Sequence, residues 1–280
     1  MVVALDRPLP LIQAGYPVAV ITGRNDAPPA EEYAAEELRR HLYAIAGAGP
    51  YRRMDARSRS DLNGPTIFLN DWEAAAAAGI ASELAPEAFH LESRDGNLYL
   101  LGGGPRGVLY GVYDLLETLG CRWYTPELTR LPRRRNLALP PLCKTEAPAF
   151  EFRDMWIWDG SDPVWWQRNR MNGWYTPVPA YMGGHVDYGL FVHTFYKLLP
   201  PEEFFAGHPE YYSLLDGARR HEMGQLCLTN PDVLRIVTAR VLAAMRANPR
   251  ATIFSVSQND WEGACECPAC SRVVDEEGSQ

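Results

Sequence analysis

The stretch Ala251–Cys270 reads ATIFSVSQNDWEGACECPAC, and it decides the fold class. Thr252 to Val256 is a short apolar and β-branched run, which predicts a buried strand. A helical pattern over Pro231–Ala247 precedes it, with Asn230 as the capping residue and a proline in the first turn. Repeated helix-then-strand order is typical of a parallel sheet with crossover connections. The stretch therefore predicts an α/β fold.

Polar residues begin where this predicted strand ends. They are Ser257, Gln258, Asn259, Asp260, Trp261 and Glu262, with the tryptophan as the one aromatic member. Parallel sheets and barrels bind their ligands at the carboxyl ends of strands. The position therefore predicts a functional site. The alternative is a capped strand end that leads into a cysteine-rich loop.

Three cysteines follow in the pattern Cys-x-Cys-x-x-Cys, namely Cys265, Cys267 and Cys270. Thiolates are zinc ligands, and a structural zinc takes four of them or a mixture with histidine. Cys227 or a histidine is available to complete such a set. The spacing leaves three alternatives open, which are a structural zinc, a local disulfide and free thiols.

Composition limits the classes of partner. The chain has 280 residues, enough for one large or two moderate domains. It holds 35 acidic and 27 basic residues and a net charge of −8, which argues against a nucleic-acid partner. No run approaches the about 18 apolar residues that span a membrane, so we expect no membrane association. The start of the chain lacks the pattern of a signal peptide, and a cytoplasmic location is favoured.

The first part of the chain alternates predicted strands and helices. Val18 to Thr22 and Thr66 to Leu69 read as strands, and Glu31–Ala46 reads as an amphipathic helix between them. Arg94-Asp95-Gly96-Asn97 lies between two apolar runs and predicts a hairpin.

The run Gly102–Gly107 contains the pattern G-x-G-x-x-G ahead of a predicted helix over Arg106–Leu119. Glu127 even follows at the spacing of a dinucleotide-binding fingerprint. That fingerprint requires the first strand of a parallel βαβ unit, whereas the preceding strand here belongs to a hairpin. The glycines therefore predict a tight turn and close packing of the helix on the sheet.

A proline-rich stretch from Leu131 to Pro148 has no sustained period and predicts a domain boundary. We expect a first domain over residues 1–140 and a second over residues 148–280. Pro163–Met171 reads as a helix of the second domain. Four further segments read as strands, namely Phe150–Trp158, Gly173–Val178, His193–Leu199 and Tyr211–Leu215.

Two parts of the chain resemble known families. Val18 to Trp123, with EEYAAEELRRHL and LLGGGPRGVLYGVYDLLE, resembles the α/β domain that precedes the catalytic barrel in bacterial α-glucuronidases and chitobiase-type β-hexosaminidases. The second part resembles the bacterial family named domain of unknown function 4838 through FRDMWIW, RNRMNGW, HPEYYSLLDG, QLCLTNPDV and SQNDWEGACECPAC. Together the two resemblances cover nearly the whole chain.

The resemblance implies an α/β architecture, with a sandwich-like α/β domain followed by an incomplete (β/α)8 TIM-type barrel. A whole barrel takes about 250 residues, so we expect its first half and a truncated protein, inactive by itself. The implied function is hydrolysis of a glycosidic bond by carboxylate acid/base chemistry at the C-terminal face of the barrel. The implied substrate is an oligosaccharide or polysaccharide. The alternative is a non-catalytic carbohydrate-binding or scaffold protein on the same fold.

The resemblance also implies roles for single residues. Arg153 matches a hexosaminidase arginine that grips sugar hydroxyls. The Asp-Glu pair of those enzymes is Asn259-Asp260 here, so we expect Asp260 to be the general acid, while Asn259 cannot supply the orienting charge. Acetamido-assisted chemistry is therefore in doubt. Asp154, Glu262 and a residue beyond this sequence are the alternatives for the second carboxyl group.

Aromatic and histidine side chains complete the candidate site. Trp156, Trp158 and Trp261 are expected to offer ring faces to a sugar, because an indole stacks on the apolar face of a pyranose. His193, near a predicted strand start, is the histidine candidate. The chemistry requires no cofactor, and the one metal expected is a structural zinc on the cysteine cluster.

Overall fold

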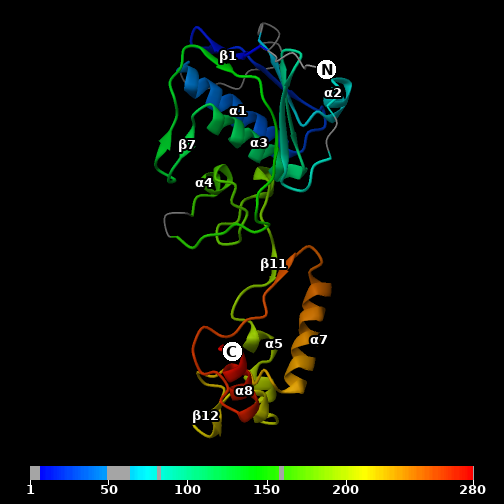
Figure 1. The fold of residues 1–280 in the computed structure, drawn as a ribbon, viewed down its shortest axis with the longest axis vertical. Coiled ribbons are helices and arrows are strands. Elements are labelled where there is room, and N and C mark those ends of the chain that lie inside the picture. The colour runs from blue at the N-terminus through cyan, green and yellow to red at the C-terminus, as the bar shows by residue number, and fades with distance from the viewer. Residues whose placement is uncertain (1–6, 49–63, 81–82, 158–160, 280) are drawn as a thin grey trace. The chain divides into compact units, whose positions relative to one another are not determined.

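The computed structural model describes residues 7–48, 64–80, 83–157 and 161–279 (Figure 1). The chain divides into two compact units, Met1–His185 and Val186–Gln280. Within the described ranges, no helix has the length and apolar character needed to cross a membrane.

The first unit is built on a five-stranded mixed sheet with the order β10-β5-β6-β4-β3. Its strands are β3 (Val20–Gly23), β4 (Thr66–Leu69), β5 (Phe89–Arg94), β6 (Asn97–Gly102) and β10 (Cys143–Glu146). β3, β4 and β6 run parallel, whereas β5 pairs antiparallel with both β6 and β10. Asp95 and Gly96 both have positive φ and turn the chain between β5 and β6, so the predicted hairpin is confirmed.

Helices cover both faces of this sheet. The residues of β6 alternate between them, with Leu98 and Leu100 in the main core and Tyr99 and Leu101 in a second cluster. α1 (Pro29–Ala46) and α3 (Gly104–Thr118) pack on the main-core face, and α2 (Trp72–Ala77) packs on the other. The first unit is therefore a layered α/β structure, as its sequence predicts.

Short strands complete the first unit. A three-stranded sheet has the order β2-β1-β9, and a hairpin pairs β7 with β8. Their bounds are β1 (Leu9–Gln13), β2 (Tyr16–Pro17), β7 (Arg122–Trp123), β8 (Thr129–Arg130) and β9 (Leu137–Leu139).

The glycine-rich turn between β6 and α3 serves packing. A Cβ on Gly107 would lie 2.4 Å from the carbonyl oxygen of Ala88, and one on Gly103 would lie 1.9 Å from that of Ala85. Both contacts are with backbone, which cannot swing aside as a side chain can. The glycines therefore let α3 begin in close contact with the β5–β6 hairpin, as expected. β6 pairs antiparallel with β5, so the strand before the glycines does belong to a hairpin.

The segment after the proline-rich stretch folds onto the first unit through a buried carboxylate. Glu87 accepts hydrogen bonds from Arg153 Nη2 (2.8 Å) and Asn172 Nδ2 (2.9 Å), and it pairs with Arg106. Burial opposes ionisation of Glu87, but these hydrogen bonds and the arginine charges outweigh it, so the pKa of Glu87 lies below its ordinary value. A carboxylate near the start of β5 therefore holds Arg153 and Asn172 in place.

Two further arginines attach the same segment. Arg168, at the end of α4 (Pro163–Arg168), pairs with the fully buried carboxylate of Glu37 at 3.0 Å. Arg170 pairs with Glu117 of α3 at 2.5 Å. The two compact units divide at His185/Val186, C-terminal to the break that the prolines predict. The ion pairs of Arg153, Arg168 and Arg170 join these three residues to the earlier part of the first unit.

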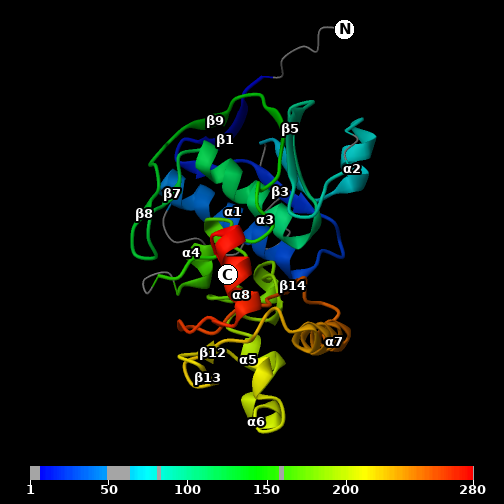
Figure 2. The same cartoon turned by 60° about the horizontal axis from the view of Figure 1, so that its bottom comes forward.

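The second unit consists of short elements and the longer helix α7 (Pro231–Ala247), which is seen nearly end-on at one side in Figure 2. β11 (Tyr188–Leu190) pairs in parallel with β14 (Ile253–Phe254), and β12 (Leu214–Leu215) pairs antiparallel with β13 (Ala218–Arg219). Its helices are α5 (Phe195–Leu198), α6 (Pro201–Phe204), α7 (Pro231–Ala247) and α8 (Pro268–Glu277). The helix predicted over 231–247 and the strand predicted after it are confirmed, the strand in shortened form.

The mixed α/β class is confirmed, but the described residues form no closed barrel, and β11 with β14 is the one parallel pair among those of the second unit. Residues 193–199 contain α5 rather than a strand. Residues 211–215 contain the end of the 3₁₀-helix Pro209–Tyr211 and the antiparallel strand β12. Residues 150–157 and 173–178 lie outside the strands that the structure describes. Pro209 explains part of the difference at residues 211–215, since it begins the 3₁₀-helix that ends there and donates no ladder hydrogen bond.

Replacing Glu87 by glutamine tests the buried network. We expect Glu87→Gln to lower the free energy of unfolding at neutral pH by about 3 kcal/mol, because Arg106 and Arg153 lose their counter-charge. The folded-state pKa of Glu87 is depressed, so its contribution is present above the unfolded-state pKa and is lost as the pH falls through the folded value. The difference between wild type and variant should therefore shrink in acid.

The measurement is urea unfolding at neutral and acidic pH. The control is Glu73→Gln, an exposed position on α2, which should change stability by less than about 0.5 kcal/mol. Equal effects of the two substitutions would contradict the role given to Glu87.

Candidate functional site

The residues after β14 line an open hollow of about 470 Å³ in the second unit. Its walls are His193, Gln225, Gln258, Asn259, Asp260, Trp261, Glu262, Gly263 and Ala264. Because β14 ends at Phe254, the hollow lies past the carboxyl end of a parallel strand, where the sequence predicts a site. Five of the predicted site residues, 193 and 259–262, thus come together there.

The side-chain amide of Gln225 hydrogen-bonds to the loop of residues 258–264 that lines the hollow. Gln225 is 4% exposed; its Oε1 accepts from Asn259 N (2.9 Å), and its Nε2 donates to the carbonyl oxygens of Asn259 (3.2 Å) and Trp261 (2.6 Å). Its backbone N–H donates to Gly263 O at 3.1 Å. One buried side chain therefore satisfies backbone groups on both sides of Asp260.

Gln225 is not among the residues that the sequence predicts for the site. It lies in the apolar run QLCL, beside Leu226, which forms a bridge with Tyr212. A polar residue within a run that reads as buried was the available signal, because a buried amide must find partners.

Gly224 supplies a second anchor. Its carbonyl oxygen accepts from Trp261 Nε1 (2.8 Å) and from Asn259 Nδ2 (3.3 Å). The Trp261 ring also meets Tyr196 edge-on at 5.9 Å between centroids. The indole of Trp261 is therefore fixed in orientation at the wall of the hollow, and the side-chain amide of Asn259, which is 3% exposed, is engaged with the backbone.

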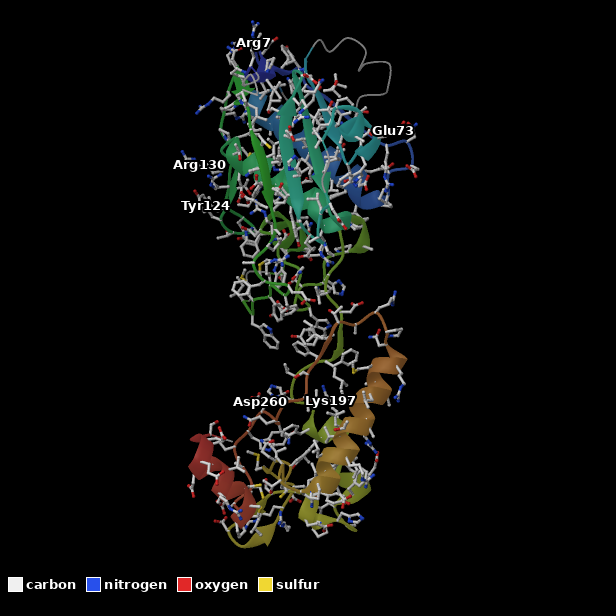
Figure 3. The ribbon with its side chains drawn as sticks, turned by 45° about the vertical axis from the view of Figure 1, so that its right-hand side comes forward. Arg7, Glu73, Tyr124, Arg130, Lys197 and Asp260 are labelled. Carbon is white, nitrogen blue, oxygen red and sulfur yellow. The ribbon has the colours of Figure 1, made fainter. Side chains whose placement is uncertain are left out.

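Asp260 lies beside His193 (Asp260 is labelled in Figure 3). Its Oδ1 is 3.8 Å from His193 Nε2, and its side chain is 84% exposed. His193 Nδ1 lies 3.1 Å from the carbonyl oxygen of Gln258. A carbonyl oxygen only accepts, so Nδ1 carries the hydrogen, and in a neutral imidazole Nε2 then has a lone pair facing the carboxyl group.

The loop after β14 also fixes His193 itself. His193 has a φ of 56°, and its N–H donates to Ser257 Oγ at 2.9 Å. The Ser257 carbonyl oxygen accepts from Thr194 N and Phe195 N, at the start of α5. The left-handed backbone at His193, unusual outside glycine, is held by these contacts.

Arg153 belongs to the first unit, where its guanidinium has internal acceptors. Nε donates to Arg170 O (2.6 Å), Nη1 to Phe150 O (2.5 Å), and Nη2 to Glu87 and to Tyr110 Oη (both 2.8 Å). Its side chain is 14% exposed. In this structure Arg153 therefore ties Phe150 and Arg170 to α3 and to Glu87, which precedes β5.

Three other predicted residues also lie in the first part of the chain. The carboxylate of Asp154 accepts from Met155 N and from Trp174 N, both at 2.8 Å, and so organises a turn. Trp156 is 66% exposed and stacks on Tyr175 at 5.2 Å. Trp158 lies outside the described residues.

The three predicted metal ligands meet Cys227. The sulfurs of Cys227, Cys265, Cys267 and Cys270 all lie within 4.8 Å of one another, and all four residues are buried. A hydrogen bond with Cys265 lowers the pKa of the Cys227 thiol, and the neighbouring Arg219 acts in the same direction. The four sulfurs therefore form one buried cluster, and Cys265 directly follows the residues that line the hollow.

The comparisons place the chain in a family. Residues 123–280 match the family described as Domain of unknown function (DUF4838). The match spans more than half of the sequence, and the chain belongs to this family.

The similar solved structures include "A novel family GH115 4-O-Methyl-alpha-glucuronidase, BtGH115A, with specificity for decorated arabinogalactans". The similarity has a TM-score of 0.39 and 21% identity and covers 51% of this chain and 19% of that one. The chain thus spans about a fifth of the length of that protein. No curated protein matches.

Replacing Gln225 by alanine tests how the hollow is built. Gln225→Ala should lower the free energy of unfolding by about 2 kcal/mol, because it leaves buried backbone groups of residues 259–261 without partners. Gln258→Ala is the control, since this exposed glutamine contributes only its backbone carbonyl to His193. Chemical unfolding measures both variants, and a loss no larger for Gln225→Ala than for Gln258→Ala would contradict the role of the amide.

Proposed function

We propose that this chain is part of a carbohydrate-active protein and that the hollow past β14 binds a sugar. The observation that carries the proposal is the grouping of one oriented indole, two carboxylates and an imidazole on its wall: Trp261, Asp260, Glu262 and His193. A sugar presents apolar C–H faces and a rim of hydroxyls. An aromatic ring beside hydrogen-bonding groups complements both.

The proposed reaction is hydrolysis of a glycosidic bond, with Asp260 as the acid. In the proposed step, the Asp260 carboxyl group gives its proton to the glycosidic oxygen as the bond from the anomeric carbon breaks, and the alcohol leaves. A second carboxylate then activates water or attacks the sugar directly. Glu262 lines the same hollow and is the candidate on this loop. The chemistry needs no cofactor.

The architecture proposed for this function is the barrel that the sequence resembles. β11 and β14 are parallel, and α7 comes directly before β14, as a helix precedes the next parallel strand in a (β/α) barrel. We propose the two strands as members of such a barrel, within the domain that the sequence predicts over 148–280, with the hollow at its C-terminal face.

A second candidate function is sugar binding without hydrolysis. The 84% exposure of Asp260 favours it, because glycosidase acids are typically held in surroundings that disfavour the charged carboxylate. On this alternative, Asp260 and Glu262 accept hydrogen bonds from hydroxyls, and Trp261 supplies the stacking face.

The test uses the intact protein with natural oligosaccharides and with aryl glycosides of the same sugars. We expect Asp260→Asn to cut turnover of natural substrates by about 10²- to 10⁴-fold, while aryl glycosides with good leaving groups lose less. Asp275→Asn, at an exposed position of α8, is the matched control and should keep full activity.

Binding is measured separately, by calorimetry with the sugars identified on a glycan array. Trp261→Ala should weaken binding by about tenfold whether or not the protein hydrolyses its ligand. Wild-type binding without turnover would select the second candidate. Full activity of Asp260→Asn on both substrate types would contradict the acid role, and unchanged binding by Trp261→Ala would contradict the sugar site.

A further inference from the structure

We infer that Cys227, Cys265, Cys267 and Cys270 are the four ligands of a structural zinc ion. The sulfurs of Cys267 and Cys270 lie 3.7 and 3.9 Å from that of Cys227. A tetrahedral zinc with bonds of about 2.3 Å to sulfur sets its ligand sulfurs about 3.8 Å apart. A disulfide requires about 2.05 Å between sulfurs. The observed separations therefore fit a shared metal and not a bridge.

Backbone contacts bring these ligands together from distant parts of the chain. Cys227 donates its N–H to Tyr211 O at 2.8 Å, and Glu266, between two of the cysteines, donates to Leu214 O at 2.9 Å. Cys267 precedes Pro268 at the start of α8, and Cys270 lies in the first turn of that helix. Tyr211, shortly before β12, and Leu214, within β12, thus hold both halves of the ligand set.

The neighbours of the sulfurs suit a charged cluster. Four thiolates around Zn²⁺ carry a net negative charge, which needs hydrogen-bond donors and a nearby cation. Arg219 Nη1 lies 3.6 Å from Cys265 Sγ, and Leu214 N donates to the same sulfur at 3.4 Å. Thr229 Oγ1 lies 3.2 Å from Cys270 Sγ. Each contact places a hydrogen-bond donor beside a sulfur that would be negatively charged as a zinc ligand.

The small core of the second unit gives the metal a structural role. Its main apolar cluster has six buried members, namely Phe195, Leu199, Tyr211, Tyr212, Leu226 and Val233. The 17-residue helix α7 contributes only Val233 to the buried residues. A unit with so limited a core gains much from a metal crosslink. Here the crosslink joins the residues before α7 to α8 and to the loop of the hollow.

The experiment measures metal in the purified, reduced chain. We expect one tightly bound zinc per chain, removable by a strong chelator. Co²⁺ in its place should give the intense visible bands and the sulfur-to-metal charge-transfer band of a tetrahedral thiolate site. Cys227→Ser and Cys265→Ser should each weaken zinc binding by at least about 10²-fold. Cys143→Ser, an exposed cysteine of the first unit, is the control and should leave binding unchanged.

Hydrogen exchange on the wild-type chain keeps the test independent of variants that fail to fold. Removing zinc should speed exchange of the Cys227 and Glu266 amides, while the amides of α3 in the first unit keep their rates. The inference is overturned if the reduced chain binds no zinc, if Co²⁺ shows no thiolate spectrum, if Cys143→Ser abolishes binding, or if a disulfide links any of the four cysteines. None of these readouts involves a sugar, so the metal site and the proposed function fail separately.

Discussion

The candidate site depends on the side-chain amide of Gln225. Backbone groups of residues 259 to 261 face this amide. A side-chain amide carries two N–H donors and a carbonyl acceptor, and all three are used here, two toward carbonyl oxygens and one toward an N–H. Because Gln225 is buried, removing its amide would leave each of these backbone groups without a hydrogen-bond partner and without water to replace it. The orientation of Trp261 and the position of Asp260 beside His193 follow from that fixed loop.

In the first unit, too, buried polar side chains hold a segment in place, but there they are carboxylates that pair with arginines. Glu87 and Glu37 are buried carboxylates, and each meets an arginine from the segment that follows the proline-rich stretch. Prolines predict a break because they interrupt periodic structure. The ion pairs nevertheless join the segment to the first unit, since a buried carboxylate requires its partner.

Sequence patterns predicted an element correctly where residues close together in the chain are enough to form it. α7 begins and ends where its cap, proline and apolar spacing predict, and the turn at Asp95-Gly96 forms because both residues adopt positive φ. The predicted strand over 193–199 was wrong, because an apolar, aromatic-rich run does not specify whether its neighbours are strands or helices. Its residues form α5, whose first amides meet the Ser257 carbonyl oxygen.

Patterns along the chain were sufficient to predict the α/β class, the strand before residue 257, the polar loop after it and the spacing of Cys265, Cys267 and Cys270. Each is a property of residues near one another in the chain. Three pairings became visible only in the folded chain: Cys227 completes the thiol cluster, His193 faces Asp260, and Arg153 is bound to Glu87. These pairings join segments far apart in sequence, and their convergence depends on how helices, turns and buried polar groups pack, which spacing along the chain does not encode.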